Sequence, residues 1–92
     1  MNTIKSITLI GRRWFDSFGN TYHTVEIIVD GVRLIKTALA YGYGDHYIQT
    51  AQEWLHGNKL APAVGTPLWQ HCRDNEIELC TSVIDVQRKR DV

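Results

Sequence analysis

Apolar and polar side chains alternate through the first part of the chain, which is the pattern of half-buried β-strands. Positions 3–15 are rich in Ile, Leu, Thr and aromatic residues, and positions 16–20 carry the residues of a turn. In positions 22–29 every second residue from Val25 onward is apolar, so these residues share one face of a strand. The two segments therefore predict an antiparallel hairpin with one apolar face.

An Asp-Gly pair at positions 30–31 is the strongest local signal in the chain. Between two apolar runs it favours a two-residue type I′ turn, in which both residues take positive φ. Such a turn places Val29 opposite Val32. Further along the hairpin it places Ile27 opposite Leu34. We therefore expect a third strand that continues the antiparallel sheet.

Two helical segments follow the strands. Asp45 is a good N-cap for the first helix, and Gly57 is a natural end for it. Thr66 and Pro67 predict the N-cap and the first residue of a shorter second helix, which closes near positions 74–75. The apolar face of the first helix consists of Tyr47, Ile48, Ala51, Trp54 and Leu55.

Alternating apolar residues return near the C-terminus and predict a last strand over about positions 76–88. Ile84 and Val86 fall on the opposite phase from Leu79 and Val83, so either a bulge switches the face there or both faces are partly covered. The element order is β-β-β-α-α-β. It predicts an α+β fold with helices on one face of a mainly antiparallel sheet and the last strand at an edge.

Length and charge limit the class of protein. The chain has 92 residues, which predicts a single domain over positions 1–92. A core this small makes a homo-oligomer a reasonable expectation. The formal net charge is +0 at pH 7 and the pI is ≈ 6.9, which argues against a protein that coats nucleic acid by bulk charge.

The lengths of the apolar runs and the number of cysteines predict a cytoplasmic location. No run approaches the ~20 residues of a membrane span. Positions 1–10 lack the long apolar stretch of a signal peptide, so we expect a cytoplasmic protein without a membrane partner. Cys72 and Cys80 are too few for a disulfide framework, and we expect both to be reduced and buried.

Catalysis and metal binding have little support in the sequence. No pair of histidines shows zinc spacing, and His71 and Cys72 are adjacent, so they diverge on a helix. No motif links a nucleophile to a base, and hydrolase signatures are absent. We therefore expect no enzymatic activity, no metal site and no cofactor. The four histidines are His23, His46, His56 and His71.

A first candidate binding segment lies at positions 41–47, just before the first helix. Its glycines could let backbone N–H groups face an anion, and its tyrosines could stack on a base. Its spacing matches neither a phosphate loop nor a dinucleotide fingerprint. The alternative is a tight strand-to-helix turn with aromatic packing. The candidate ligand-binding residues are Tyr41, Tyr43, His46 and Tyr47.

A second candidate segment lies at positions 19–24, across the first hairpin from positions 12–14. Arginine, aromatic and amide side chains together can recognise a phosphate and a base. The alternative is a plain hairpin turn that leads into a strand. Tyr22 and His23 point to opposite faces, so they cannot both serve one pocket. The candidates are Arg12, Arg13, Trp14, Asn20, Tyr22 and His23.

Four short patterns carry a resemblance to a known group of proteins: Arg13-Trp14-Phe15-Asp16, Gly19-Asn20-Thr21-Tyr22-His23-Thr24-Val25, Tyr41-Gly42-Tyr43-Gly44 with Tyr47, and Asp85-Val86-Gln87-Arg88-Lys89-Arg90-Asp91. The chain resembles a family of small uncharacterised proteins of bacteriophages and prophages over most of its length. That resemblance implies a viral origin and action in the host cytoplasm, without an established activity. Small viral accessory proteins often antagonise host defence by binding a protein, a nucleic acid or a nucleotide signal.

Two functional hypotheses follow. The first is a non-enzymatic phage accessory protein that binds a small anionic, nucleotide-like ligand where the two glycine-containing segments face one polar hollow. The second is a module that binds a host protein or nucleic acid through a basic sheet edge formed by Arg12, Arg13 and positions 88–90. Nucleic-acid binding through that edge would be weak and salt-sensitive, because the rest of the chain is neutral.

Overall fold

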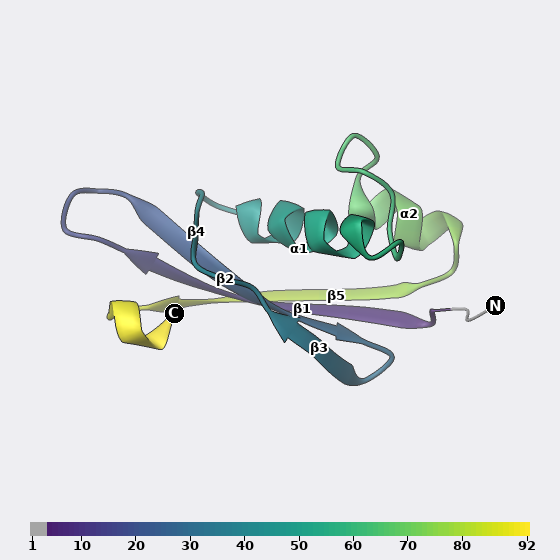
Figure 1. Ribbon diagram of the computed structural model, residues 1–92, viewed down its shortest axis with the longest axis horizontal. Coiled ribbons are helices and arrows are strands. Elements are labelled where there is room, and N and C mark those ends of the chain that lie inside the picture. The colour runs from purple at the N-terminus through teal and green to yellow at the C-terminus, as the bar shows by residue number, and fades with distance from the viewer. Residues whose placement is uncertain (1–3) are drawn as a thin grey trace.

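The computed structural model describes residues 4–92, and its element order is that of an α+β fold (Figure 1). Helices lie along one face of a five-stranded sheet whose main path is β3-β2-β1-β5, with the short β4 paired to β2. No helix within residues 4–92 has the length and apolar character needed to span a bilayer. The elements are β1 (Ser6–Phe15), β2 (Thr21–Val29), β3 (Val32–Lys36), β4 (Ala40–Tyr41), α1 (His46–Gly57), α2 (Leu68–Asp74), β5 (Glu78–Val86) and the short 3-10 helix η1 (Lys89–Asp91).

Strand β1 occupies the interior of the sheet and is paired along almost its whole length on both sides. Its partner on one side is β2, in antiparallel register from Ile7 to Phe15. On the other side it pairs with β5 in parallel register from Ser6 to Trp14. Parallel strands need a long crossover connection, and the two helices between β3 and β5 supply it. The last strand therefore lies at an edge, as predicted.

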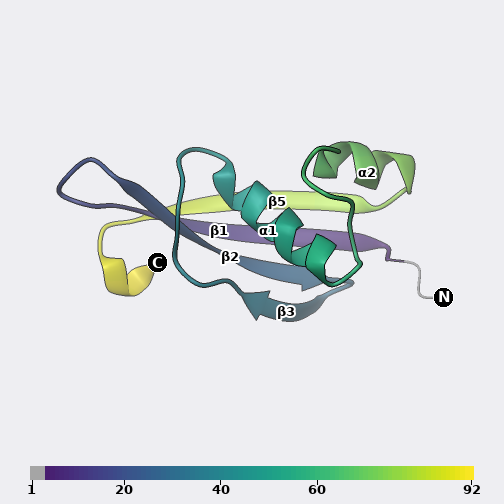
Figure 2. The same cartoon turned by 45° about the horizontal axis from the view of Figure 1, so that its top comes forward.

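The hydrophobic core lies between the helices and one face of the sheet (Figure 2). Strand alternation turns Ile7, Leu9, Val25 and Ile27 toward the helices, and each is fully buried. Burial of a side chain of this size stabilises the fold by about 1.5–3 kcal/mol. The helices contribute Tyr47, Ala51, Leu55, Leu68 and Cys72 to the same core.

The predicted hairpin turn at positions 30–31 is confirmed, but the register beyond it differs. Asp30 has φ 51° and Gly31 has φ 81°, as a type I′ turn requires. Val29 pairs with Val32, whereas Ile27 pairs with Ile35 and not with Leu34. A β-bulge inserts Leu34 as an extra residue and leaves it 43% exposed.

The helix ends follow the sequence only in part. Helix α1 ends at Gly57 as predicted, and Asp45 occupies the N-cap position without making a capping hydrogen bond. Helix α2 begins at Leu68 with Pro67 as its N-cap residue, so the prediction of Thr66 as N-cap is wrong by one position. Of the two alternatives left open for positions 83–84, the bulge is absent, because the pairing of β5 with β1 is regular from end to end.

The two cysteines lie in different environments. Cys72 is 1% exposed in the core, and burial raises the pKa of its thiol. Cys80 is exposed, because its place in β5 turns it away from the helices, so the prediction that both cysteines are buried is wrong. Both are free thiols.

The contact of helix α1 with β1 depends on a glycine. A Cβ atom added to Gly11 would lie 2.7 Å from the ring of Tyr47. We expect Gly11→Ala to lower the free energy of unfolding by about 1–3 kcal/mol, because the buried ring has no room to move away. Chemical denaturation measures this loss.

The matched control is Gly57→Ala, where an added Cβ meets no atom within 4 Å. Its free energy of unfolding should stay within about 1 kcal/mol of that of the wild type. An equal loss in both variants would contradict the close approach of Tyr47 to Gly11.

Candidate functional site

The residues predicted from sequence to form a binding site are divided between the two faces of the sheet. In the β1–β2 register Trp14 pairs with Tyr22, and Arg13 pairs with His23. Side chains alternate between faces, so the first pair lies on the face away from the helices and the second on the helix-covered face. The prediction that Tyr22 and His23 point to opposite faces is thereby confirmed. We call the face away from the helices the open face.

An aromatic row extends over the open face at the end of the sheet that β4 joins. We define the aromatic row as Trp14, Tyr22, Tyr41 and Tyr43. The Trp14 and Tyr22 rings are stacked, with centroids 5.6 Å apart. Tyr22 meets Tyr41 edge to face at 5.6 Å, and Tyr41 meets Tyr43 in the same way at 5.3 Å. Such ring contacts are mutually stabilising and hold the rings in place.

The outer half of the aromatic row is accessible to a ligand. Tyr41 is 53% exposed and Tyr43 is 54% exposed. Their hydroxyl groups are 2.5 Å apart and hydrogen-bonded, which raises the pKa of Tyr41, with desolvation adding to the effect. The Tyr41 phenol therefore stays neutral at physiological pH and can offer a ring face to a planar ligand.

Arg12 lies beside the row on the open face, but its charge is already paired. Its guanidinium donates a hydrogen bond of 2.5 Å to the carboxylate of Glu26, which also lies 3.7 Å from Arg33. The hydrogen bond from Arg12 is the main reason that the pKa of Glu26 is lowered. Arg12 is therefore a weaker candidate for binding phosphate than the sequence suggested.

The exposed basic residues near the row come from the C-terminus. Val86 is the β5 partner of Trp14, and Arg88 follows two positions later. Positions 88–90 are exposed, and η1 lies on the side of the sheet away from the helices (Figure 1). Lys36 donates a hydrogen bond of 3.1 Å to the carbonyl of Val92. This bond connects the residue after η1 to β3, the edge strand opposite β5.

The predicted basic sheet edge does not form as expected. Arg12 and Arg13 lie on β1, an interior strand, and point to opposite faces. The guanidinium of Arg13 donates to both carboxylate oxygens of Asp85, at 2.7 and 3.2 Å, and to the carbonyl of Gly44 at 3.2 Å. Only the basic residues at positions 88–90 remain from that proposed edge.

On the helix-covered face, three of the predicted residues have structural roles. Tyr47 is 3% exposed and packs in the core. His23 is 1% exposed, and its Nε2 lies 2.6 Å from the hydroxyl of Thr50. The His46 ring lies 5.3 Å from the His23 ring. Burial lowers the pKa of His23, and repulsion from His46 lowers it further, against an opposing contact with the Gly42 backbone.

The two glycine-containing segments lie side by side without forming the predicted polar hollow. The Gly42 N–H donates a hydrogen bond of 3.0 Å to the Thr21 carbonyl, which joins the segments as paired strands β2 and β4. Asn20 is held in its own turn, where its backbone and side-chain N–H groups donate to the carboxylate of Asp16. What the segments share is strand pairing and ring contacts.

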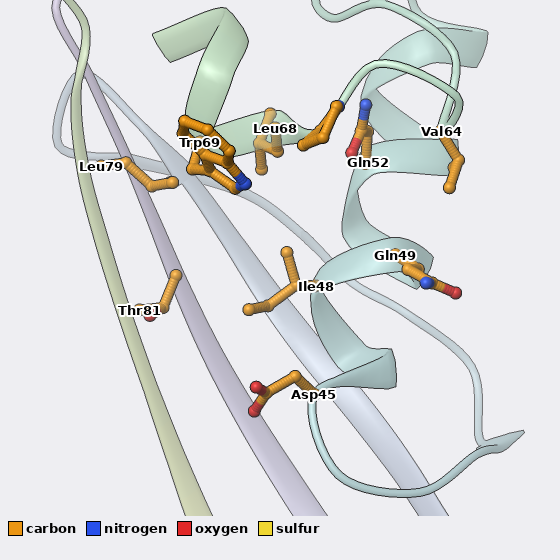
Figure 3. A pocket seen from close by; sticks show the side chains of 10 residues that line it. Asp45, Ile48, Gln49, Gln52, Val64, Leu68, Trp69, Leu79 and Thr81 are labelled. Carbon is orange, nitrogen blue, oxygen red and sulfur yellow. The ribbon is translucent and has the colours of Figure 1, made fainter. Parts of the chain in front are cut away.

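A groove of about 390 Å³ lies elsewhere, between α1, α2 and β5 (Figure 3). The indole of Trp69 and the side chain of Ile48 lie in it, and the Asp45 carboxylate lies at one end. The sequence did not reveal this groove, because it depends on the parallel placement of β5. Its other lining residues are Gln49, Gln52, Val64, Pro67, Leu68, Leu79 and Thr81.

No protein-family model, curated protein or solved structure matches this chain. Within residues 4–92, no group of three or more His, Cys, Asp or Glu side chains is placed to hold a metal ion. The candidate site must therefore be assessed from its own geometry, in which the exposed Tyr41 and Tyr43 rings of the aromatic row suit a planar ligand.

The buried His23 predicts how stability changes with pH. The folded state favours the neutral imidazole, whereas the unfolded chain binds a proton with a pKa of about 6.5. This contribution to stability is therefore complete above about pH 6.5 and decreases as the pH falls below that value. Thermal unfolding between neutral and mildly acidic pH should show the decrease.

The decrease should be smaller in His23→Gln, which removes the titrating group and keeps a side chain able to bond Thr50. The exposed His56 provides a matched control as His56→Gln. If His23→Gln and His56→Gln change the pH profile equally, burial of His23 is not the source of the acid sensitivity.

Proposed function

We propose that this chain is a non-enzymatic binding protein that takes up a nucleotide-like anion by stacking its base on the aromatic row. The observation that carries the proposal is the set of four connected rings on the open face, two of them about half exposed. Every nucleobase has a π-face, so such a row can stack on any base and needs no particular nucleotide sequence. The β1–β2 and β2–β4 pairings hold the rings in place before a ligand arrives.

Among nucleotide-like ligands, a short single strand suits this surface better than a lone nucleotide. A small molecule is usually bound in a concave pocket that buries most of its surface. The aromatic row lies instead on an open sheet face, as in single-strand binding surfaces where successive bases stack on successive rings. Arg88, Lys89 and Arg90 come from the neighbouring strand end and supply positive charge for phosphates.

The place of action is part of the same proposal. The resemblance to small phage and prophage proteins supports action in the cytoplasm of an infected bacterium. A protein that sequesters a nucleotide signal or a short single strand there would antagonise a host defence that depends on that molecule. This role requires binding alone, which agrees with a site made of rings and cationic side chains.

Binding of a fluorescently labelled, short oligo-dT strand, followed by anisotropy at low salt, tests the proposal directly. We expect Tyr41→Ala to weaken binding by about 1–3 kcal/mol, the usual contribution of one aromatic stacking interaction. Trp69→Ala is the matched control, because Trp69 is 57% exposed but lies in the groove on the other face.

Unlabelled mononucleotides and cyclic nucleotides are then added as competitors. Competition at concentrations similar to that of the strand would identify a small nucleotide as the ligand. Absence of binding by any of these ligands, or equal losses in Tyr41→Ala and Trp69→Ala, would remove the proposal.

The C-terminal basic residues should contribute by neutralising phosphates. Replacing Arg88, Lys89 and Arg90 by alanine should weaken strand binding, and the slope of log affinity against log salt should become shallower by up to ~0.7 for each phosphate that is no longer neutralised. Anisotropy at several salt concentrations measures the slope. An unchanged slope would show that these residues do not touch phosphate.

A further inference from the structure

We propose that the free edge of β5 pairs with β5 of a second copy of this chain. The two strands would run antiparallel about a two-fold axis perpendicular to the sheet. The inference concerns an interface and does not depend on the proposed ligand. It rests on the difference between the two sheet edges, on the charge pattern of β5 and on the apolar side chains beside it.

The two edges of the sheet differ in their ability to accept another strand. Edge strand β3 has 5 residues, contains the bulge at Leu34 and carries Arg33 and Lys36. Short length, bulges and cationic side chains are the features that keep natural edge strands from pairing. Edge strand β5 has 9 residues in unbroken register with β1, and it contains no proline, lysine or arginine.

The backbone of β5 presents hydrogen-bonding groups toward its free side. The Glu78 N–H donates to the Lys5 carbonyl at 2.9 Å, so the backbone N–H and C=O of Glu78 point toward β1. Backbone groups alternate along a strand, which turns the N–H and C=O of Leu79, Thr81 and Val83 outward. The protein therefore offers a regular series of donors and acceptors at this edge.

The charge pattern of β5 is compatible with pairing to itself. Its only ionisable carboxylates, Glu78 and Asp85, lie near the two ends, and the residues from Leu79 to Ile84 carry no formal charge. Antiparallel self-pairing brings the neutral centre of one strand against the neutral centre of the other. The ion pair with Arg13 further neutralises Asp85.

Apolar side chains beside this edge are left uncovered. Ile84 on the open face is 48% exposed, and Trp69 above the helix-covered face is 57% exposed. Trp69 borders the groove that Leu79 and Thr81 line from β5 (Figure 3). A second copy seated on β5 would cover apolar surface on both faces, which favours association.

The symmetry of this pairing has a structural consequence. A two-fold axis perpendicular to the sheet keeps the helices of both copies on one side and both open faces on the other. The strands would join the two copies into one continuous sheet. Because Val86 lies beside Trp14, the two aromatic rows would lie toward opposite ends of the paired strands.

Sedimentation equilibrium over a micromolar to millimolar concentration series tests the interface. We expect the wild type to form a dimer. Ile84→Lys should raise the dimer Kd by about tenfold or more, because it replaces exposed apolar surface beside the edge with a cationic side chain, which keeps edge strands from pairing. Thr81→Pro should have a similar effect, because it removes an outward N–H without breaking the β1 pairing.

The matched control is Leu34→Lys, an equal change at a similarly exposed apolar residue on β3. It should leave the dimer Kd unchanged, and far-UV circular dichroism should show that all three variants stay folded. A wild type that is monomeric throughout the series would overturn the proposal. So would a dimer that Leu34→Lys dissociates while Ile84→Lys and Thr81→Pro do not.

Discussion

The pairing of β1 on both of its sides is the constraint on which the rest of the structure depends. Because β2 and β5 are aligned to the same strand, each β1 residue determines which side chains lie together on each face. Gly11 at the middle of β1 admits the ring of Tyr47 and so brings α1 close to the sheet. A shift of one residue in this register would exchange the two faces and bury the wrong set of side chains.

The two faces of the sheet consequently have different roles. On the helix-covered face, His23 and Tyr47 are buried and the charge of Arg13 is paired with Asp85, so these groups stabilise the fold. Neither α1 nor α2 covers the open face, and Tyr41 and Tyr43 remain about half exposed there. A surface of connected rings suits flat ligands, and the neighbouring basic C-terminus suits anionic ones. The proposed binding function and the proposed dimer interface thus use different surfaces of one sheet.

Local signals predicted much of this fold. The Asp-Gly turn, the first hairpin and the apolar face of α1 each depend on neighbouring residues, and all three were predicted correctly. The bulge at Leu34 was not predictable from alternation, because the extra residue interrupts the strand without changing its composition. The exposure of Cys80 and the groove beside Trp69 depend on the parallel pairing of β5 with β1, which joins segments far apart in the sequence.

The sequence singled out the rings of the aromatic row as candidates but did not show which of them would lie in contact. The contact between Trp14 and Tyr22 could have been predicted from the register of the first hairpin. The contact between Tyr22 and Tyr41 could not, because it depends on the β2–β4 pairing. The predicted hollow failed because adjacent residues in a strand point to opposite faces.

The most direct test of the division between the faces is an NMR titration with a short single strand, followed at the tryptophan indole N–H signals. Trp14 reports on the aromatic row, and Trp69 reports on the groove of the other face. The proposed function predicts a concentration-dependent shift of the Trp14 signal with little change at Trp69. A shift confined to Trp69 would contradict it and would place ligand binding in the groove.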